Sequence, residues 1–514
     1  MPAKSIMIQG TGSGVGKSII VAALCRIFKK DGFKVAPFKA QNMALNSFVT
    51  RSGGEMGRSQ VVQAQAAGIE PQVEMNPILI KPTADTKAQI IVLGHPLGNF
   101  SAMQYHKFKT KLLKVIEDSY QKLARKYDIV VIEGAGSPAE VNLREGDIVN
   151  METARMTNSP VILVGDIDKG GVFAWLWGTI DLLSDEDRKR VKGIIINKFR
   201  GDKRILKPGL KWLEKKTGCP VVGVIPFFKH IRIHEEDSLS LDYVKFQKEG
   251  EIKIEIVYLP HISNFTDFDP LMEIEGVSVR YVGRGEPLSN PDAVIIPGTK
   301  NTIDDLTYLI EEGYVDQIRY LAKKGKIIMG ICGGFQMLGK EVRDPWHIES
   351  KLTTVRGIDL LDAVSSIDRK KITHQVKAIF QINPVDKKPD GENILYGYEI
   401  HMGSTDLGSG ARYLFKIVER SGKPVEVMDG AVNLKGNVFG TYIHGIFDNP
   451  YFTSWFVNLI RSQKGLAPIK YTPGGINLDE EYDKLCCWVE KNIDKKLLYK
   501  IVEKGMREGC CSDD

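Results

Sequence analysis

Three features are scarce in this 514-residue sequence, and each shortage excludes a class of protein. The first is a long apolar run, since none approaches the roughly 20 residues that a membrane-spanning helix needs. The sequence also enters an apolar segment at residues 5–9 without the charged and small-residue flanks of a signal peptide. We therefore expect a cytoplasmic protein with no membrane partner.

The second scarce feature is cysteine. The chain has seven, at positions 25, 219, 332, 486, 487, 510 and 511. Their spacing matches no zinc site, and reduced thiols are the ordinary state of cysteine in the cytoplasm. The sequence therefore predicts reduced cysteines and no structural zinc.

The third is charge gathered in blocks. Lys and Arg number 70 against 64 Asp and Glu, and the net charge of +6 is spread thinly along the chain. This gives little support for a nucleic-acid partner and mildly favours small anionic ligands. The hydrophobic content of 43% is typical of a soluble globular protein, and the length exceeds one ordinary core, so we expect two to four domains.

A glycine-rich stretch at residues 10–18, Gly-Thr-Gly-Ser-Gly-Val-Gly-Lys-Ser, has the context of a phosphate-binding loop. It lies between an apolar strand pattern and a helix pattern, as such a loop requires. Backbone N–H groups at Gly12, Gly14 and Gly16 can curl around an anion because no Cβ stands in the way. The stretch therefore predicts a nucleotide site.

Two side chains of this loop have expected roles. Lys17 would reach the terminal phosphates, and the hydroxyl of Ser18 would bind Mg²⁺. The loop departs from the strict pattern, because Gly10 lies one position too early. In this it resembles the dethiobiotin-synthetase branch of P-loop proteins.

Polar residues follow several predicted strands, at the edge where parallel sheets bind ligands. Glu133 ends an apolar run and is the candidate carboxylate for Mg²⁺, since glutamate would be an unusual helix cap. Asp166, Asp168 and Lys169 follow another strand and are candidates for phosphate or substrate contacts. Asn197 ends a third, where many P-loop proteins place an asparagine that hydrogen-bonds the nucleotide base.

The segment 39–47 is dense in amides and begins at the end of a predicted strand. Gln41, Asn42 and Asn46 are therefore candidates for substrate contacts. The alternative, that these side chains satisfy backbone groups of a loop, is equally open.

Strand and helix patterns alternate through the first half, which predicts a parallel sheet covered on both faces. A charged stretch without apolar periodicity follows, and alternation restarts near residue 251. We expect an α/β fold in each half, with a parallel sheet in the first. The expected units are a P-loop domain over 1–230, a linker over 231–250, a second α/β domain over 251–450 and a helical tail over 451–514.

Cys332 directly follows an apolar strand pattern and precedes two glycines and a helix pattern. A nucleophile occupies this position at a sharp strand-to-helix turn, where the helix N-terminus favours a thiolate. The N–H groups of Gly333 and of the turn at Gly298 would stabilise an oxyanion. A cysteine after a strand is usually a small buried residue, but the flanking glycines argue against that interpretation.

A cysteine nucleophile needs a base. His444 ends a strand pattern and is our candidate. His401 and His374 remain alternatives, because spacing along the chain cannot show a contact.

Seven motifs, in order, resemble the cobyric acid synthase family, which joins a dethiobiotin-synthetase-like ATPase to a class I glutamine amidotransferase. They lie at residues 9–18, 39–47, 133–143, 166–173, 330–338, 397–403 and 440–447. The resemblance runs from Met1 to about Pro450. The sequence beyond that point carries no recognisable motif.

The resemblance implies a ligase that uses ATP, Mg²⁺ and glutamine to amidate the b, d, e and g carboxylates of adenosylcobyrinic acid a,c-diamide in cobalamin biosynthesis. Cys332 would form a thioester with glutamine, with His444 as base, and ammonia would be released. In the ATPase domain a substrate carboxylate would become an acyl phosphate, which ammonia displaces. The implied partners are small molecules, and a homo-oligomer stays open. Free ammonia is lost or protonated in water, so we expect a sheltered route between the domains.

One departure concerns the base. Class I amidotransferases carry His-x-Glu, and the glutamate position here is Ile446. The third member of the triad is therefore absent or supplied from elsewhere. If nothing orients the imidazole, glutaminase turnover is expected to be slow.

Two alternatives stay open. Cobyrinic acid a,c-diamide synthase shares both domains and the chemistry but acts on different carboxylates; the segments 397–403 and 39–47 favour cobyric acid synthase over it. The other is a ParA/MinD-like P-loop partner protein with a non-catalytic amidotransferase module, against which the intact Cys332 and His444 argue.

Overall fold

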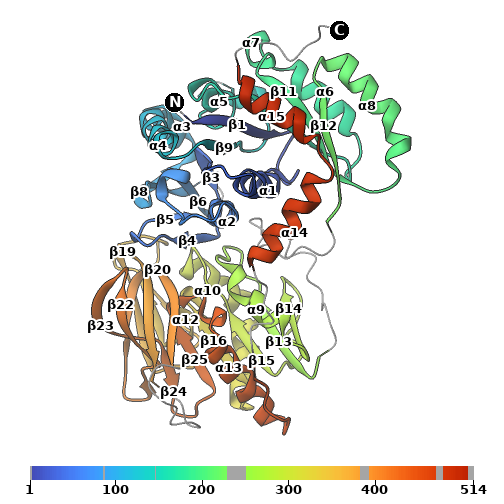
Figure 1. Ribbon diagram of the computed structural model, residues 1–514. Helices are drawn as coiled ribbons and strands as arrows, with labels where there is room; N and C mark the ends of the chain where they lie inside the picture. Colours follow the sequence, from blue (N-terminus) through green and yellow to red (C-terminus); the bar gives the residue numbers. More distant parts are fainter. Residues whose placement is uncertain are drawn as a thin grey trace.

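The computed structural model describes residues 3–84, 87–144, 146–228, 250–381, 393–470 and 478–506. Two α/β domains, one above the other in Figure 1, make up this part of the chain. The expected linker at 231–250 lies outside the described residues except for Gly250.

The first domain is built on a parallel sheet with strand order β12-β11-β10-β1-β9-β2. Met7 lies in one apolar core, while its neighbours Ile6 and Ile8 lie in the core on the opposite face. Both faces are buried, which explains why each strand reads as a continuous apolar run. The six strands, all predicted from the sequence, are β1 (Lys4–Gly10), β2 (Val35–Phe38), β9 (Ile129–Glu133), β10 (Val161–Asp166), β11 (Val191–Phe199) and β12 (Val221–Pro226).

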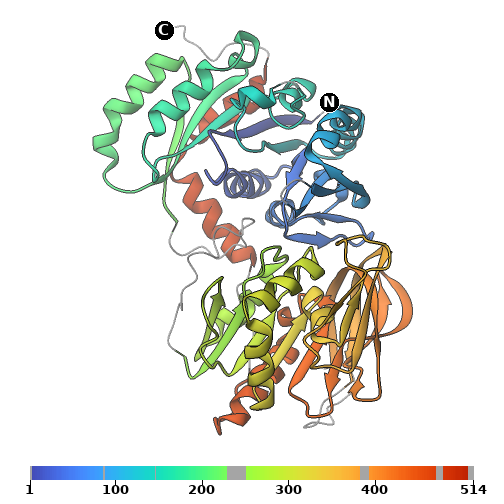
Figure 2. The ribbon, with the colours of Figure 1, turned by 180° about the vertical axis from the view of Figure 1, so that it is seen from behind.

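Helices cover both faces of this sheet (Figures 1 and 2). The core on the face of Ile6 is shared by α1 (Lys17–Lys30), α14 (Leu478–Glu490) and α15 (Lys495–Lys504). The opposite core contains residues of α4 (Leu113–Lys126), α5 (Met151–Met156), α6 (Val172–Asp181) and α8 (Lys203–Thr217). The remaining helices of this domain are α2 (Arg58–Ala66), α3 (Ala102–Phe108) and α7 (Asp185–Arg188).

A smaller sheet of order β3-β6-β7-β8 is attached to this domain and was not predicted from the sequence. Prolines interrupt its strand patterns, so the sequence did not predict these strands. Pro96 lies in the edge strand β8, and both Pro82 and Pro96 adjoin shifts of register, where a strand tolerates the missing N–H of proline. Its strands are β3 (Gln41–Met43), β6 (Ile78–Ala84), β7 (Lys87–Val92) and β8 (His95–Ser101), and beside it lies the hairpin of β4 (Ser47–Val49) and β5 (Glu55–Gly57).

The second domain contains a sheet of order β14-β13-β15-β16-β25-β24-β21, parallel from β14 to β25. The strands are β13 (Ile252–Val257), β14 (Val277–Val282), β15 (Ala293–Ile296), β16 (Ile327–Ile331), β21 (Ala411–Arg412), β24 (Ala431–Asn433) and β25 (Val438–Thr441). The helices are α9 (Asp269–Glu273), α10 (Thr302–Glu311), α11 (Tyr314–Lys323), α12 (Gly333–Leu338) and α13 (Pro450–Gln463).

A second sheet of this domain has the order β18-β17-β19-β20-β26, with β22 paired to β19 and β23 to β22. Its long antiparallel pair, β19 and β20, reaches the first domain at the hairpin β4–β5. The strands are β17 (Glu341–Arg343), β18 (Thr354–Arg356), β19 (Ala363–Phe380), β20 (Ile394–Leu407), β22 (Phe415–Arg420), β23 (Lys423–Asp429) and β26 (Ile443–His444).

The segment beyond residue 450, which the sequence suggests is a single helical tail, is divided between the two domains. Helix α13 places Phe452 and Phe456 in the core of the second domain. Helices α14 and α15 return to the first domain, where Arg26 of α1 forms an ion pair with Asp479 and the N–H of Asp494 donates to the carbonyl of Val222. Figure 1 shows these two red helices against the first domain.

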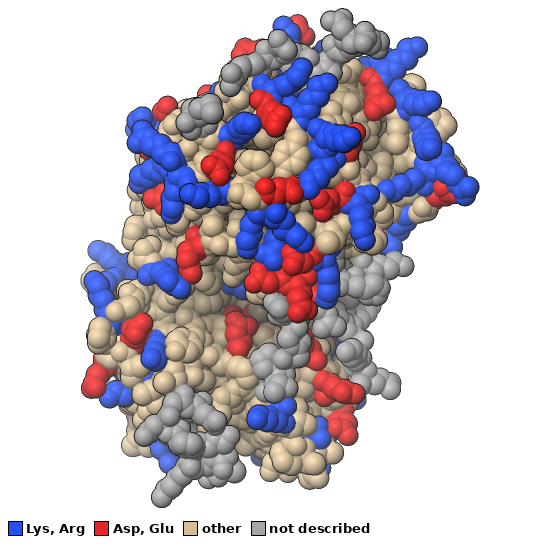
Figure 3. Space-filling view, viewed as in Figure 1, with Lys and Arg blue, Asp and Glu red and all other residues tan. Residues whose placement is uncertain are grey.

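Acidic and basic side chains are interspersed over the face shown in Figure 3, in line with the thinly spread net charge. Among the helices in the described residues, none combines the length and apolar character that crossing a bilayer requires.

Candidate active sites

The first domain has a cavity of about 830 Å³ at the carboxyl ends of its central strands. The glycine-rich loop forms part of its wall. The cavity brings together eight residues that the sequence nominates for nucleotide, metal or substrate: Gly14, Gly16, Lys17, Ser18, Gln41, Asn42, Glu133 and Asn197.

The loop has the geometry of an anion site at the N-terminus of α1. Gly16 has φ of 97°, and a Cβ there would lie 2.2 Å from Nδ2 of Asn197, so only glycine fits. The ammonium of Lys17 donates to the carbonyl of Gly12 at 2.8 Å and to that of Gly136 at 3.2 Å. Lys17 therefore lies across the loop, facing the segment that follows β9.

Glu133 is buried at the end of β9 and accepts hydrogen bonds from Ser18 Oγ at 2.8 Å and from Gln63 Nε2 at 2.5 Å. Lys39 forms an ion pair with it at 2.9 Å. Burial raises the pKa of this carboxyl, but Lys39 and the hydrogen bonds outweigh burial and hold the pKa below its usual value. The carboxylate of Glu133 and the hydroxyl of Ser18 are hard oxygen donors, a set that fits Mg²⁺.

Asn197 holds the loop with one end of its amide and leaves the other end unused. Its Nδ2 donates to the carbonyl of Val15 at 2.9 Å. Its Oδ1 is buried and accepts no hydrogen bond from the described residues. This oxygen can accept a hydrogen bond from an amino group of a nucleotide base.

Five of the nominated residues do not line this cavity: Gly12, Asn46, Asp166, Asp168 and Lys169. Asp166 forms an ion pair with Lys198 at 3.0 Å, and Asp168 forms one with Arg200 at 2.7 Å. Lys169 is exposed. The carboxylates of Asp166 and Asp168 therefore form ion pairs within the first domain.

The amide-rich segment divides in the same way. Gln41 and Asn42 line the cavity, where Gln41 accepts a hydrogen bond from the hydroxyl of Tyr105 at 2.5 Å. Asn46 lies at the domain interface, with its Oδ1 accepting a hydrogen bond from the backbone N–H of Phe265 at 3.2 Å. Sequence position alone did not separate these two surroundings.

In the second domain, Cys332 lies at the strand-to-helix turn between β16 and α12 that the sequence predicts. Its φ of 52° is in the left-handed region, which is strained for a residue with a side chain and typical of a nucleophile elbow. A Cβ on Gly334 would lie 2.1 Å from the carbonyl oxygen of Ile296, so this turn packs directly on the end of β15. Gly334, the second residue after the nucleophile, is therefore required by packing.

Two nominated oxyanion groups lie beside this elbow. Gly333 is the residue after Cys332, and a Cβ on it would lie 2.5 Å from the methyl group of Thr299. A Cβ on Gly298 would lie 2.9 Å from Cε1 of His444, so Gly298 borders the imidazole. Both backbone positions can face a reacting carbonyl beside the sulfur.

His444 is buried at the end of β26, where Cys332 is near enough to raise the pKa of the imidazole. The thiol of Cys332 donates to the carbonyl of Ile400 at 3.5 Å. Its Nδ1 lies 2.6 Å from Oδ2 of Asp267. The other oxygen of Asp267 accepts a hydrogen bond from the N–H of Gly445 at 3.0 Å. Cys332, His444 and Asp267 therefore have the arrangement of nucleophile, base and orienting acid.

The surroundings favour a charged imidazole. Burial lowers the pKa of His444, but the carboxylate of Asp267 and the nearby Cys332 outweigh burial and raise the pKa to about 10. The ring of Tyr398 stacks on the imidazole with centroids 5.4 Å apart. Asp267 and Tyr398 thus hold the imidazole of His444 in one orientation, and Asp267 also favours its protonated form.

Asp267 is the functional residue that sequence reasoning missed. It lies 177 positions before His444 in a short 3-10 helix, Phe265–Phe268, that follows β13. It replaces the glutamate expected at the position of Ile446, whose side chain is buried in the core. The only signal in the sequence was an acidic residue shortly after a strand, which is too common to single out.

The rival histidines have other partners. His401 stacks on Tyr442 with centroids 3.9 Å apart and contacts Glu399 at 3.4 Å. His374 contacts the hydroxyl of Ser421 at 3.3 Å. Of the three candidates, His444 is the one that lies near Cys332 and contacts Asp267.

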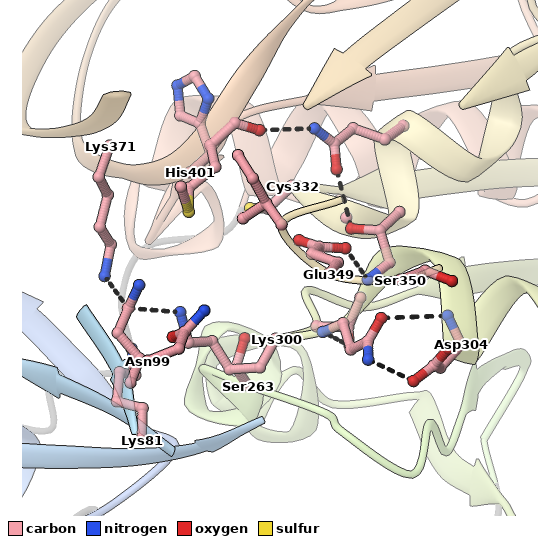
Figure 4. Close-up of a pocket in the computed structure, with 18 of the residues that line it drawn as sticks. Lys81, Asn99, Ser263, Lys300, Asp304, Cys332, Glu349, Ser350, Lys371 and His401 are labelled. Carbon is pink, nitrogen blue, oxygen red and sulfur yellow. Dashed lines mark hydrogen bonds between the residues drawn. The ribbon is translucent and has the colours of Figure 1, made fainter. Parts of the chain in front are cut away.

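Cys332 opens into a second cavity of about 900 Å³, lined by residues of both domains (Figure 4). The second domain contributes Gln336, Glu349 and His401, and the first contributes Gln89 of β7 and Asn99 of β8. Burial raises the pKa of Glu349 to about 7. The cysteine therefore faces a polar chamber at the domain interface.

A buried glutamate, two lysines with buried side chains and one half-buried lysine lie at this interface. Glu55 accepts hydrogen bonds from Lys81 at 2.5 Å and from Lys371 of the second domain. Lys300 donates to Gln89 at 3.2 Å. Burial, followed by the charge of Lys371, holds the pKa of Lys300 well below its usual range. We call Glu55, Lys81, Lys300 and Lys371 the interface cluster.

Comparison with known proteins fits both halves. Residues 6–241 match the CobQ/CobB/MinD/ParA nucleotide binding domain, and residues 253–452 match the CobB/CobQ-like glutamine amidotransferase domain. The cobyric acid synthase of Caldanaerobacter subterraneus subsp. tengcongensis is 51% identical over 98% of this chain and 99% of its own. The chain belongs to the cobyric acid synthase family. This confirms the resemblance seen in the motifs and makes the chain an amidating ligase of cobalamin biosynthesis.

Other members of the family are similar to this chain over nearly the same length. The cobyric acid synthase of Alkaliphilus metalliredigens is 53% identical over 97% of this chain and 99% of its own. Solved structures match loosely, among them PurLQS from Thermotoga maritima, which is 22% identical over 46% of this chain and 97% of its own, with a TM-score of 0.29.

Proposed function

We propose that this ligase amidates the b, d, e and g carboxylates of adenosylcobyrinic acid a,c-diamide, using ATP and glutamine. The observation that carries the proposal is the pair of complementary cavities in one chain: one lined by a phosphate-binding loop, the other by a cysteine nucleophile. Neither chemistry alone forms an amide from an acid. Together they supply an activated carboxylate and a nitrogen nucleophile.

In the second domain, the sulfur of Cys332 attacks the side-chain carbonyl carbon of glutamine. The departing nitrogen takes a proton from the imidazolium of His444 and leaves as ammonia, and a thioester remains on Cys332. Water then hydrolyses the thioester to glutamate and the free cysteine, with His444 accepting the proton. Asp267 fixes the imidazole through Nδ1, and N–H groups at Gly333 and Gly298 stabilise the oxyanion.

In the first domain, a substrate carboxylate attacks the γ-phosphorus of ATP, and ADP leaves. Lys17 and the backbone of the loop carry the phosphate charge, while Ser18 and Glu133 would hold Mg²⁺, which neutralises charge on the phosphates when bound. Ammonia then attacks the carbon of the acyl phosphate, and inorganic phosphate leaves. Gln41 and Asn42 lie on the wall of this cavity, where they would contact the substrate.

The small sheet supports a sheltered route for ammonia. Gln41, Asn42 and Met43 of β3 line the nucleotide cavity, and Lys81, Gln89 and Asn99 of β6, β7 and β8 line the amidotransferase cavity. One sheet thus borders both cavities. Its position favours passage of ammonia within the protein over release to solvent.

The test is incubation of the protein with ATP, Mg²⁺, glutamine and a corrinoid, followed by mass spectrometry of the corrinoid. We expect four amides on the a,c-diamide and none on cobyrinic acid. Two amides on cobyrinic acid and none on the a,c-diamide would assign the chain to a,c-diamide synthesis instead. Glutamine hydrolysis that is indifferent to every corrinoid, with no amide formed, would overturn both assignments.

A further inference from the structure

Two hydrogen bonds connect the amide-rich segment of the first domain to the catalytic turn of the second. Oδ1 of Asn46 accepts a hydrogen bond from the N–H of Phe265 at 3.2 Å, and the N–H of Ser47 donates to Oδ1 of Asn264 at 3.0 Å. Asn46, Ser47, Asn264 and Phe265 are at most 4% exposed. We call this pair of bonds the interdomain clamp.

The interdomain clamp is bonded to Asn264 and Phe265, at the start of the turn that contains Asp267. Asn264 has φ of 54° and starts the 3-10 helix, and its carbonyl accepts the N–H of Asp267 at 3.0 Å. The carboxylate of Asp267 then reaches Nδ1 of His444 at 2.6 Å. Only one residue, Thr266, separates the N–H that Asn46 holds from the acid that orients the base.

The same segment reaches the nucleotide cavity at its other end. Lys39 forms the ion pair with Glu133 at 2.9 Å. Asn42 donates to Gln60 at 3.0 Å, and Gln60 donates to Glu133 at 3.3 Å. Residues 39–47 therefore run from the candidate Mg²⁺ ligand to the clamp.

We infer that Asn46 is a positioning residue for glutamine hydrolysis, acting through Asp267, and that segment 39–47 couples the nucleotide cavity to the glutaminase. Mg²⁺ bound with ATP in the cavity would compete with Lys39 and Gln60 for the oxygens of Glu133, so the contacts of these two residues would change. The clamp passes that change to the turn of Asp267. This inference rests on the proposed function, since it requires glutaminase and ATP sites in one chain.

A matched control lies at the same interface. Gln375 of β19 donates from Nε2 to the carbonyl of Val49 at 2.9 Å, so it also links the two domains. That bond does not involve the turn of Asp267. A variant that loosens the interface without disturbing the triad is therefore Gln375→Ala.

The experiment measures kcat and KM for glutamine hydrolysis by the full chain, with and without Mg²⁺ and ATP, in wild type, Asn46→Ala and Gln375→Ala. We expect Asn46→Ala to lower kcat by about tenfold with little change in KM, and to lose the increase that Mg²⁺ and ATP cause in wild type. Gln375→Ala should behave as wild type. Ammonia-dependent amidation by the same preparations should be retained, which shows that Asn46→Ala is folded.

A second variant approaches the clamp from the other domain. Asn264→Gly removes the acceptor of the Ser47 N–H while keeping a residue that adopts positive φ readily, and it should give the same pattern as Asn46→Ala. Wild-type kcat in both clamp variants, or an equal loss in Gln375→Ala, would overturn the inference and leave the proposed function intact. Wild-type protein that hydrolyses no glutamine would instead refute the proposed function.

Discussion

The carboxylate of Asp267 lies 2.6 Å from Nδ1 of His444, although the two residues are 177 positions apart. Asp267 belongs to a 3-10 helix, and His444 ends β26. The structure thereby supplies the orienting acid that the His-x-Glu pattern lacks at Ile446. A buried imidazole held in this way keeps one tautomer and one orientation toward Cys332. The slow turnover expected from the sequence no longer has a structural basis.

Replacing Asp267 should strongly lower the rate of glutamine hydrolysis. We expect Asp267→Asn to lower kcat for glutamine hydrolysis by about 10²–10⁴-fold, because the amide leaves the imidazolium without a counter-charge. Ammonia-dependent amidation should stay within about twofold of wild type, since that reaction needs no thioester. Glutaminase kinetics of an Asp267→Asn variant that match wild type would contradict the triad.

The same pair should make stability depend on pH. The pKa of His444 is raised to about 10 from the roughly 6.5 of an unfolded histidine. Its contribution to the free energy of unfolding is therefore complete below pH of about 6.5 and is lost as pH rises through about 10. Urea unfolding of wild type and Asp267→Asn should show a larger gap at pH 6 than at pH 10.

The control for this measurement is Asp316→Asn, which removes an acid that is 89% exposed. Its gap from wild type should be small at both pH values. A gap between wild type and Asp267→Asn that is constant from pH 6 to pH 10 would contradict the raised pKa.

The two active sites should be separable by mutation. We expect Cys332→Ala to abolish glutamine-dependent amidation and to retain ammonia-dependent amidation, because only the first needs the sulfur. Lys17→Ala should abolish both, because each needs the activated carboxylate. Loss of ammonia-dependent activity in Cys332→Ala would show that the cavities do not divide the chemistry as described.

The interface cluster should stabilise the joined domains. Glu55→Gln leaves Lys81 and Lys371 buried without their carboxylate, and we expect a loss of about 3–5 kcal/mol in the free energy of unfolding. Burial raises the pKa of Glu55, but Lys371 and Lys81 hold it well below its usual value, so its contribution is present above pH of about 4.5 and is lost as pH falls through the lowered pKa.

Chemical denaturation at neutral and acid pH checks this prediction. Glu426→Gln loses an exposed ion pair with Lys416 and should cost less than about 1 kcal/mol. A Glu55→Gln variant as stable as Glu426→Gln would show that the cluster contributes little to joining the domains.

The sequence predicted what depends on local pattern. Six buried strands, the loop before Lys17 and the turn at Cys332 all follow from apolar runs, glycines and helix periodicity within about 20 residues. In the structure, residues of these features line the two cavities. The sequence did not show that Asp166, Asp168 and Lys169 lie outside the lining of the nucleotide cavity, because the ion pairs of the two aspartates form with residues at the end of another strand.

The rest depends on contacts between distant segments. Asp267 and Asn46 owe their surroundings to the meeting of two domains, and nothing within a few residues of either marks that meeting. The small sheet escaped prediction because Pro82 and Pro96 break its strand patterns. The return of α14 to α1 was equally hidden, because an amphipathic helix does not specify its partner.

Nitrogen freed at Cys332 should reach a carboxylate activated beside Lys17 without passing through solvent. The direct measurement supplies glutamine labelled with ¹⁵N in its side-chain amide, together with ATP, Mg²⁺, adenosylcobyrinic acid a,c-diamide and excess unlabelled ammonium near neutral pH. Mass spectrometry should then show ¹⁵N in all four new amides. Amides that carry the isotope ratio of the bulk ammonium would show that the nitrogen passes through solvent.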